Sequence, residues 1–108
     1  MADRFNSTLK DFLKALVSIF PNNQGVALTS MMMDEYNGTG IRDAFSKELD
    51  ETTRKMLADR DERLITDSEL MRKLLQYSFV DFSELWTLLS AENKKIVWFW
   101  LDALAASV

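Results

Sequence analysis

The sequence predicts an all-α fold, a compact bundle of five or six helices with an apolar C-terminal helix near its centre. Apolar residues recur at helical spacing through most of the chain, and no useful length alternates strictly between apolar and polar residues. One Pro and three Gly in 108 residues leave few helix breakers. The C-terminal helix is expected over 91–107, and from Ile96 onward only Asp102 and Ser107 are polar, which is typical of a buried helix.

The first helix is expected from about residue 6 or 7 to residue 20. Pro21 ends it, because proline disfavours the helical conformation in the residue before it. A shorter helix is expected over 26–36, and it ends where the composition of 37–40 favours a loop. The apolar face of the first helix shares the i, i+3, i+4, i+7 spacing and consists of Leu9, Phe12, Leu13, Leu16, Val17 and Phe20.

A third helical region is expected from Ile41 to about Arg63, with a break near Asp50 left open. Its apolar stripe is narrow and the remaining residues are mostly charged, so one face should be solvated. The stretch 66–69, Thr-Asp-Ser-Glu, combines capping residues with an early acid and predicts the start of a fourth helix.

Two caps are expected in the last third of the chain. Asp81 can cap a short helix over 82–89, and Ser90 can cap the C-terminal helix. Glu92 lies in the first turn of that helix, where a negative charge interacts favourably with the helix dipole.

The C-terminal helix carries Trp98 and Trp100 on different faces of an ideal helical wheel. Trp98 shares its face with Lys95 and Asp102, whereas Trp100 lies on the roughly opposite face. We therefore expect Trp100 to be buried in the core. Trp98 is expected to keep a partly exposed edge or to fill an interface.

The composition fits one helical domain over residues 1–108, with 47% hydrophobic and 28% charged residues. A chain of this length should bury roughly 65% of its unfolded surface, which is enough for one core. There is no internal repeat, low-complexity tract or interdomain linker in the sequence.

Several classes of function are disfavoured by composition. The chain has no Cys and no His, which excludes disulfides, most zinc sites and the nucleophilic triads that depend on these residues. The net charge of −4 argues against nucleic acid as a partner. No apolar stretch approaches the roughly 20 residues that span a bilayer. We expect no cofactor and a cytoplasmic location.

The densest carboxylate group is Asp59-Arg60-Asp61-Glu62. A calcium loop starting at Asp59 would need Gly at its sixth position and Glu at its twelfth, and the chain has Leu64 and Leu70 there. Its three acids, interleaved with Arg60 and Arg63 on a helix, are expected to form a solvated, partly self-paired surface. A metal-binding protein or enzyme that uses Asp and Glu alone stays as the alternative function.

Met31-Met32-Met33 is an unusual run, because methionine packs adaptably and is frequent on promiscuous binding surfaces. Three successive residues cannot share one face of a helix, so at least one should be less buried. Ordinary core filling and a peptide-binding groove both stay open for this run.

Two segments, 81–86 and 90–101, resemble a small helical module in uncharacterised proteins of large DNA viruses of algae and amoebae. In that family Asp-Phe-x-x-Leu-Trp precedes a Ser-containing turn, and a Lys-rich stretch leads into Ile-Trp-Lys-Tyr-Leu. The ending of the first helix over 16–21 is similar too. Phe99 stands where the pattern has Lys, and Trp100 where it has Tyr. The resemblance implies a helical viral module and supplies no activity or catalytic residue to assign to this chain.

We expect the chain to be a non-catalytic protein–protein interaction or adaptor module. A viral accessory role in the host cytoplasm and self-association are two forms that this function could take. Attachment of the aromatic C-terminal helix to a membrane surface is disfavoured, because that helix has few basic residues. The candidate interaction residues are Trp98, Phe99, Met31, Met32 and Met33.

Overall fold

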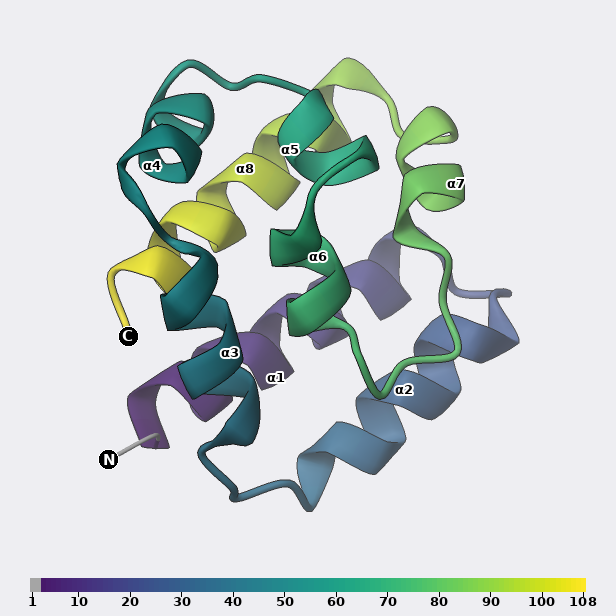
Figure 1. Cartoon of the computed structure of the whole chain (residues 1–108). Helices are drawn as coiled ribbons and strands as arrows, with labels where there is room; N and C mark the ends of the chain where they lie inside the picture. The colour runs from purple at the N-terminus through teal and green to yellow at the C-terminus, as the bar shows by residue number, and fades with distance from the viewer. Residues whose placement is uncertain (1–2) are drawn as a thin grey trace.

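The computed structural model describes residues 3–108, and this part of the chain forms α-helices and no strand. The all-α prediction is therefore confirmed. The described residues form eight helices, so the expected count of five or six is wrong. In chain order they are α1 (Asp3–Ile19), α2 (Gln24–Asp34), α3 (Gly40–Glu48), α4 (Glu51–Ala58), α5 (Arg63–Thr66), α6 (Glu69–Leu74), α7 (Phe82–Thr87) and α8 (Ala91–Ala105) (Figure 1).

The count is higher because the expected helix over 41–63 is divided. Asp50 adopts an extended backbone between α3 and α4, and its side chain accepts a hydrogen bond from the backbone N–H of Thr53 at 2.8 Å. The break near Asp50 is thus a helix cap. Arg60 then turns the chain out of α4 with a φ of 55°, and the short α5 follows.

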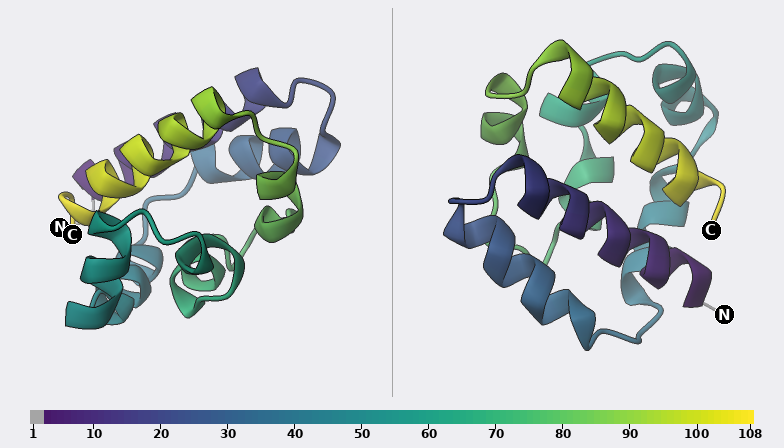
Figure 2. Two further views of the ribbon diagram at one scale, coloured as in Figure 1. Left: turned by 90° about the horizontal axis from the view of Figure 1, so that it is seen from above. Right: turned by 180° about the vertical axis from the view of Figure 1, so that it is seen from behind.

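The helices pack in two layers, and the Cα atoms extend only 18 Å along the shortest axis of the molecule. α1, α2 and α8 lie side by side, with α1 between the other two (Figure 2). The start of α1 meets the end of α8, where the hydroxyl oxygens of Thr8 and Ser107 are 3.4 Å apart. α3 to α7 cover the inner side of this layer.

The core lies between the two layers and is built on aromatic contacts from α1. The ring centroids of Phe5 and Phe45 are 5.4 Å apart, and those of Phe12 and Phe82 are 6.2 Å apart. Phe5, Phe12 and Phe45 are fully buried. The residues predicted to share the apolar face of the first helix are buried or partly buried, although the last of them, Phe20, lies just after the end of α1.

α8 begins where the sequence predicts, because the hydroxyl of Ser90 accepts a hydrogen bond from the backbone N–H of Asn93 at 3.2 Å. The helix packs against α1 and α4 and leaves Ile96 and Phe99 exposed. One of its sides therefore faces solvent, and a position at the centre of the bundle is not confirmed. Its buried residues form a single stripe of Val97, Trp98, Leu101 and Leu104.

Within residues 3–108, every helix is too short or too polar to cross a lipid bilayer.

Candidate functional site

Trp98 lies in a small aromatic cluster that a turn of the chain covers. Its ring packs edge-to-face on Trp86, with centroids 5.6 Å apart. The guanidinium of Arg60 lies 5.6 Å from the Trp98 ring centroid and donates two hydrogen bonds to the Asp102 carboxylate, at 2.9 and 2.6 Å. Arg60, held by Asp102, therefore covers the Trp98 indole on the polar side of α8.

The expectation that Trp98 keeps an exposed edge is wrong, because its exposed fraction is only 7%. An ideal wheel identifies Asp102 as a polar neighbour but does not reveal that Arg60 will reach it from the turn after α4. Trp100 was expected in the core but is only partly buried. Its ring packs on that of Phe99, with the two ring centroids 5.3 Å apart. The relative burial of the two indoles is the reverse of the prediction.

Glu62 covers the other indole of the cluster. The ring N–H of Trp86 donates to its Oε1 at 2.9 Å, and the Lys94 ammonium donates to the same oxygen at 3.2 Å. The Lys94 nitrogen also lies 5.0 Å from the Trp86 ring centroid. The Trp86 hydrogen bond and then Lys94 lower the pKa of the Glu62 carboxyl below its usual value.

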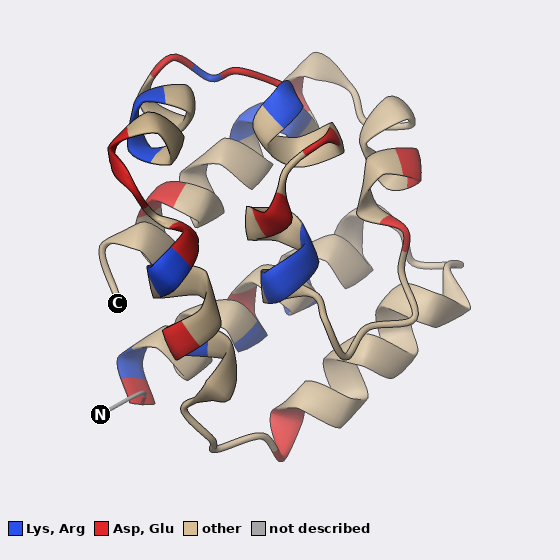
Figure 3. Ribbon diagram, viewed as in Figure 1, with Lys and Arg blue, Asp and Glu red and all other residues tan. Residues whose placement is uncertain are grey.

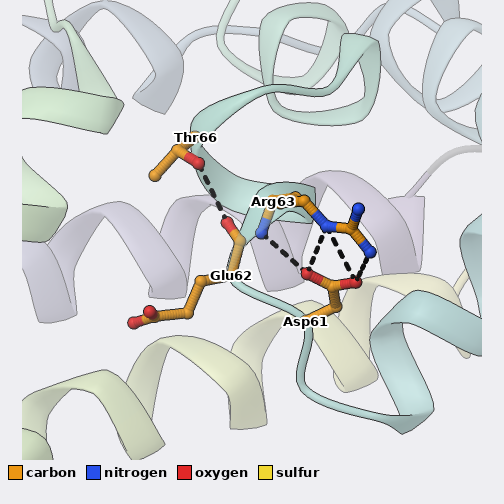
Figure 4. Close-up of polar contacts among 4 residues, drawn as sticks. All are labelled: Asp61, Glu62, Arg63 and Thr66. Atoms are coloured by element: carbon orange, nitrogen blue, oxygen red, sulfur yellow. Dashed lines mark hydrogen bonds and ion pairs between the residues drawn. The ribbon is translucent and has the colours of Figure 1, made fainter.

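Asp61 lies in the same turn and pairs locally (Figure 4). Arg63 donates to both Asp61 carboxylate oxygens, at 2.7 Å for the closest atoms, and this lowers the pKa of Asp61. The Thr66 hydroxyl donates to the backbone carbonyl of Glu62 at 3.2 Å. The expected pairing with Arg63 is therefore confirmed for Asp61, whereas Arg60 and Glu62 pair with α8 and the acids lie in a turn instead of the expected helix.

These acids do not converge. Across residues 3–108 there is no group of three or more Asp or Glu side chains that is arranged to hold a metal ion. Asp61 and Glu62 instead accept hydrogen bonds from cations and from an indole. The turn is thus a structural clamp between the end of α4 and the α7–α8 corner.

A hollow of about 300 Å³ lies between α6 and the start of α7, and Arg72, Asp81 and Ser83 are among its lining residues. Ser83 and then the backbone N–H of Glu84 donate hydrogen bonds to Asp81, which lowers the pKa of this carboxyl. A carboxyl held in its ionised form suits the cap of α7, as predicted from the sequence, better than proton transfer at neutral pH.

The methionine run divides between the core and the surface. Met33 is only 6% exposed and joins the core, whereas Met31 is 68% exposed and Met32 is also exposed. The prediction that at least one of the three is less buried is confirmed. Leu28, one turn earlier on α2, is exposed as well.

A loop segment extends this apolar surface beyond α2. Tyr77 and Phe79 lie between α6 and α7, and the side chain of Phe79 is 63% exposed. The backbone N–H of Phe79 donates to the Thr29 hydroxyl at 3.2 Å, which fastens the segment to α2. We call Leu28, Met31, Met32, Tyr77 and Phe79 the α2 surface.

Gly25 permits the close approach of these two segments. A Cβ at this position would lie 2.8 Å from the carbonyl oxygen of Phe79, closer than side-chain atoms come in practice. Sequence reasoning did not find Tyr77 and Phe79. The available signal was two aromatic residues between Gln76 and Asp81, in a stretch with no helical apolar face.

Phe99 is the third exposed candidate, with an exposed fraction of 62%, and Ile96 lies one turn before it. We call these two residues the α8 surface. It lies on the outer side of the helix layer, away from the stripe that contacts the core. The five candidate residues therefore divide into the exposed Met31, Met32 and Phe99 and the buried Met33 and Trp98.

Comparisons with protein-family models, with curated proteins and with solved structures give no match. The resemblance to a viral helical module stays a prediction from the segments 81–86 and 90–101.

Proposed function

We propose that this chain is a non-catalytic interaction module that binds a protein partner through the α2 surface. The observation that carries the proposal is the exposure of Leu28, Met31 and Met32 on α2, together with the exposed Tyr77 and Phe79 on a segment that is joined to α2 through Thr29. Isolated apolar residues are normal on protein surfaces, but large ones gathered on neighbouring segments are typical of binding sites.

The packing of the molecule supports this reading of the α2 surface. Phe5, Phe12 and Phe45 already fill the core between the helix layers, and Met33 supplies the inward-facing methionine of α2. Met31 and Met32 therefore contribute little to folding. Flexible thioether side chains at such a position can adapt to the shape of a partner.

A second surface and the cellular setting extend the proposal. Phe99 and Ile96 offer a site for a second copy, and such an assembly would enclose α8 and give it the central place that its composition suggests. The proposal of a viral accessory protein in the host cytoplasm depends on the sequence resemblance and on the lack of Cys.

The test combines light scattering at several protein concentrations with capture of partners from host extract. The double variant Met31→Gln, Met32→Gln should lose capture by about tenfold or more, while its thermal melt stays that of the wild type. Leu88→Gln is the matched control, because it removes an exposed apolar side chain that belongs to neither the α2 surface nor the α8 surface. A strictly monomeric wild-type protein that captures nothing would contradict the proposal.

The alternative, a carboxylate-based metal protein or enzyme, is tested in the same preparation. Thermal melts are recorded with calcium, magnesium or manganese. Stabilisation by several degrees with one ion would favour the alternative, since a ligand that binds only the folded state raises its stability. The pairing of Asp61 and Glu62 with Arg63, Trp86 and Lys94 favours the interaction module instead.

A further inference from the structure

We infer that the partner of the α2 surface presents a basic amphipathic helix, an inference that depends on the proposed function above. The two stretches of chain that build this surface have acidic residues and no cation. Residues 15–41 contain Asp34 and Glu35 but no Lys or Arg, and residues 74–93 contain three acids but no Lys or Arg. Figure 3 shows α2 and the 75–81 segment without blue, with red at the end of α2 and before α7.

The exposed residues of α2 form a stripe that a partner helix can follow. Leu28, Met31, Met32 and Glu35 have the i, i+3, i+4, i+7 relation, so they lie along one face, and all four are exposed. The stripe is apolar from Leu28 to Met32, just over one helical turn, and ends in the Glu35 carboxylate at the C-cap of α2. Asp34 adds a second exposed carboxylate at the same end.

The 75–81 segment supplies the second side of the seat. Phe79 is fixed through Thr29, which lies next to Met32 on an ideal wheel, at about 60° around the helix axis. The backbone of Phe79 therefore lies beside the helix that carries the methionine stripe, and the side chains of Tyr77 and Phe79 on this segment are exposed. A helix fits such a seat with apolar anchors at i, i+3, i+4 and i+7. The described residues have no strand edge that could pair with an extended peptide.

The charges decide between the possible occupants. Lys and Arg flanking the apolar stripe of a partner would meet Asp34 and Glu35, with Asp81 on the far side. A second copy docked on the same face would instead bring a second set of these acids and no Lys or Arg from residues 15–41 or 74–93 to pair with them. An anionic membrane would repel them too. Lys10 lies beyond the C-terminal end of α2, in a hollow with Tyr36 and Asn37. This one cation does not reverse the excess of negative charge around the α2 surface.

The inference is tested with designed peptides of about 18 residues, five turns of helix. One peptide has Leu at i, i+3, i+4, i+7 spacing and Lys on its remaining face. The second replaces each Lys with Glu, and the third scrambles the first so that it has no apolar face. Fluorescence anisotropy should show the Lys helix binding about tenfold or more tighter than either control. The advantage over the Glu helix should shrink at about 0.5 M salt.

Variants of the protein locate the binding. Met31→Gln, Met32→Gln should weaken the Lys helix about tenfold. The double variant Asp34→Lys, Glu35→Lys should bind the Lys helix no more tightly than the Glu helix. It should still fold, because cations are favourable at a helix C-terminus. Asp11→Lys reverses one exposed charge in the middle of α1 and should leave binding unchanged. Circular dichroism melts check that each variant folds.

Several outcomes would overturn the inference. These are equal binding of the Lys and Glu helices, equal binding of the scrambled peptide, and no effect of the Asp34 and Glu35 reversal. Co-sedimentation with vesicles containing about 30% phosphatidylserine, or a dimer lost in the methionine variant, would assign the surface to a membrane or to a second copy. If the peptides fail but partner capture still requires Met31 and Met32, the interaction module stands and only the basic helix is rejected.

Discussion

At the scale of single residues, Trp98 owes its position to several contacts of unequal weight. The edge-to-face contact with Trp86 is worth about 0.5–1.5 kcal/mol beyond burial, and the cation–π contact with Arg60 about 0.5–1 kcal/mol. The Arg60–Asp102 ion pair is nearly half exposed, so it adds at most about 1 kcal/mol. Burial of the indole against the core is therefore the largest contribution.

Trp98→Ala should lower the free energy of unfolding by about 3–5 kcal/mol, the usual cost of truncating a core aromatic residue. Trp100→Ala should cost about half as much, since its ring is only partly buried. Phe99→Ala should change stability by about 0.5 kcal/mol or less. Denaturant unfolding of the three variants measures this order, and a larger loss for Trp100→Ala would contradict the packing described.

Asn6 is a buried polar residue that ties the start of α1 to the loop before α3. Its Nδ2 donates to the carbonyl of Gly38 at 2.9 Å, and its Oδ1 is buried without a hydrogen-bond partner among residues 3–108. Asn6→Asp keeps the shape but places a carboxylate against that carbonyl. We expect a loss of about 2–5 kcal/mol at pH 7, because a buried charge is left uncompensated.

The pH dependence of Asn6→Asp separates this charge effect from a packing defect. Burial should raise the folded-state pKa of the new carboxyl above its unfolded value, which is about 3.9. The loss should then be small below pH 4 and grow as the pH rises through the raised folded pKa. Thermal melts at several pH values measure it, and a loss that is constant with pH would indicate packing alone.

At the scale of elements, the junction between α2 and the 75–81 segment depends on Gly25. Gly25→Ala should destabilise the protein by about 1–3 kcal/mol, because the new methyl would meet a backbone oxygen that cannot move alone. Gly40→Ala is the matched control at the start of α3. Its Cβ would meet only the Tyr36 hydroxyl, at an ordinary distance of 3.5 Å.

The control should be neutral or slightly stabilising, since alanine reduces the freedom of the unfolded chain. The two variants are compared by denaturant unfolding and by accessibility of Phe79 to protease. Equal stability of both variants would show that the 75–81 segment shifts at no cost.

Three helix starts, those of α4, α7 and α8, carry signals that are local in the sequence. Asp50, Asp81 and Ser90 each accept a hydrogen bond from a backbone N–H three residues later, and such caps are read from neighbouring residues alone. The short α5 was not predictable in this way. It follows a turn whose contacts reach α8, with Arg60 and Asp102 separated by 42 positions in the chain.

The candidate site was predictable in part for the same reason. The methionine run shows by spacing that one residue must turn outward, and Met31 and Met32 do. The position of Phe79 beside them depends on a hydrogen bond to Thr29 from 50 residues away. Trp98 was assigned to the wrong environment because its cover, Arg60, also comes from a distant segment.

At the scale of the whole molecule, the charged groups define the pH range in which the fold is stable. The chain has no His and no Cys, so no side chain with an ordinary pKa titrates between about pH 6 and 8. The carboxyls whose folded-state pKa is lowered lie at caps and in the 60–62 turn. The largest cause in each case is a hydrogen bond. It comes from Thr53 to Asp50, from Arg63 to Asp61, from Trp86 to Glu62 and from Ser83 to Asp81.

A carboxyl with a lowered folded pKa stabilises the fold fully above its unfolded pKa, and this contribution is lost as the pH falls through the folded value. The free energy of unfolding should therefore be nearly flat from about pH 6 to 8 and fall below about pH 4.3, the unfolded pKa of Glu.

Glu62→Gln should make this decline shallower, because glutamine still accepts the hydrogen bond from Trp86 but cannot be protonated in this range. Glu92→Gln is the control, because it removes an exposed carboxylate from α8 and changes the net charge by the same amount. Denaturant unfolding across this pH range measures both slopes. An unchanged acid slope in Glu62→Gln would mean that the clamp on Trp86 does not depend on the charge of Glu62.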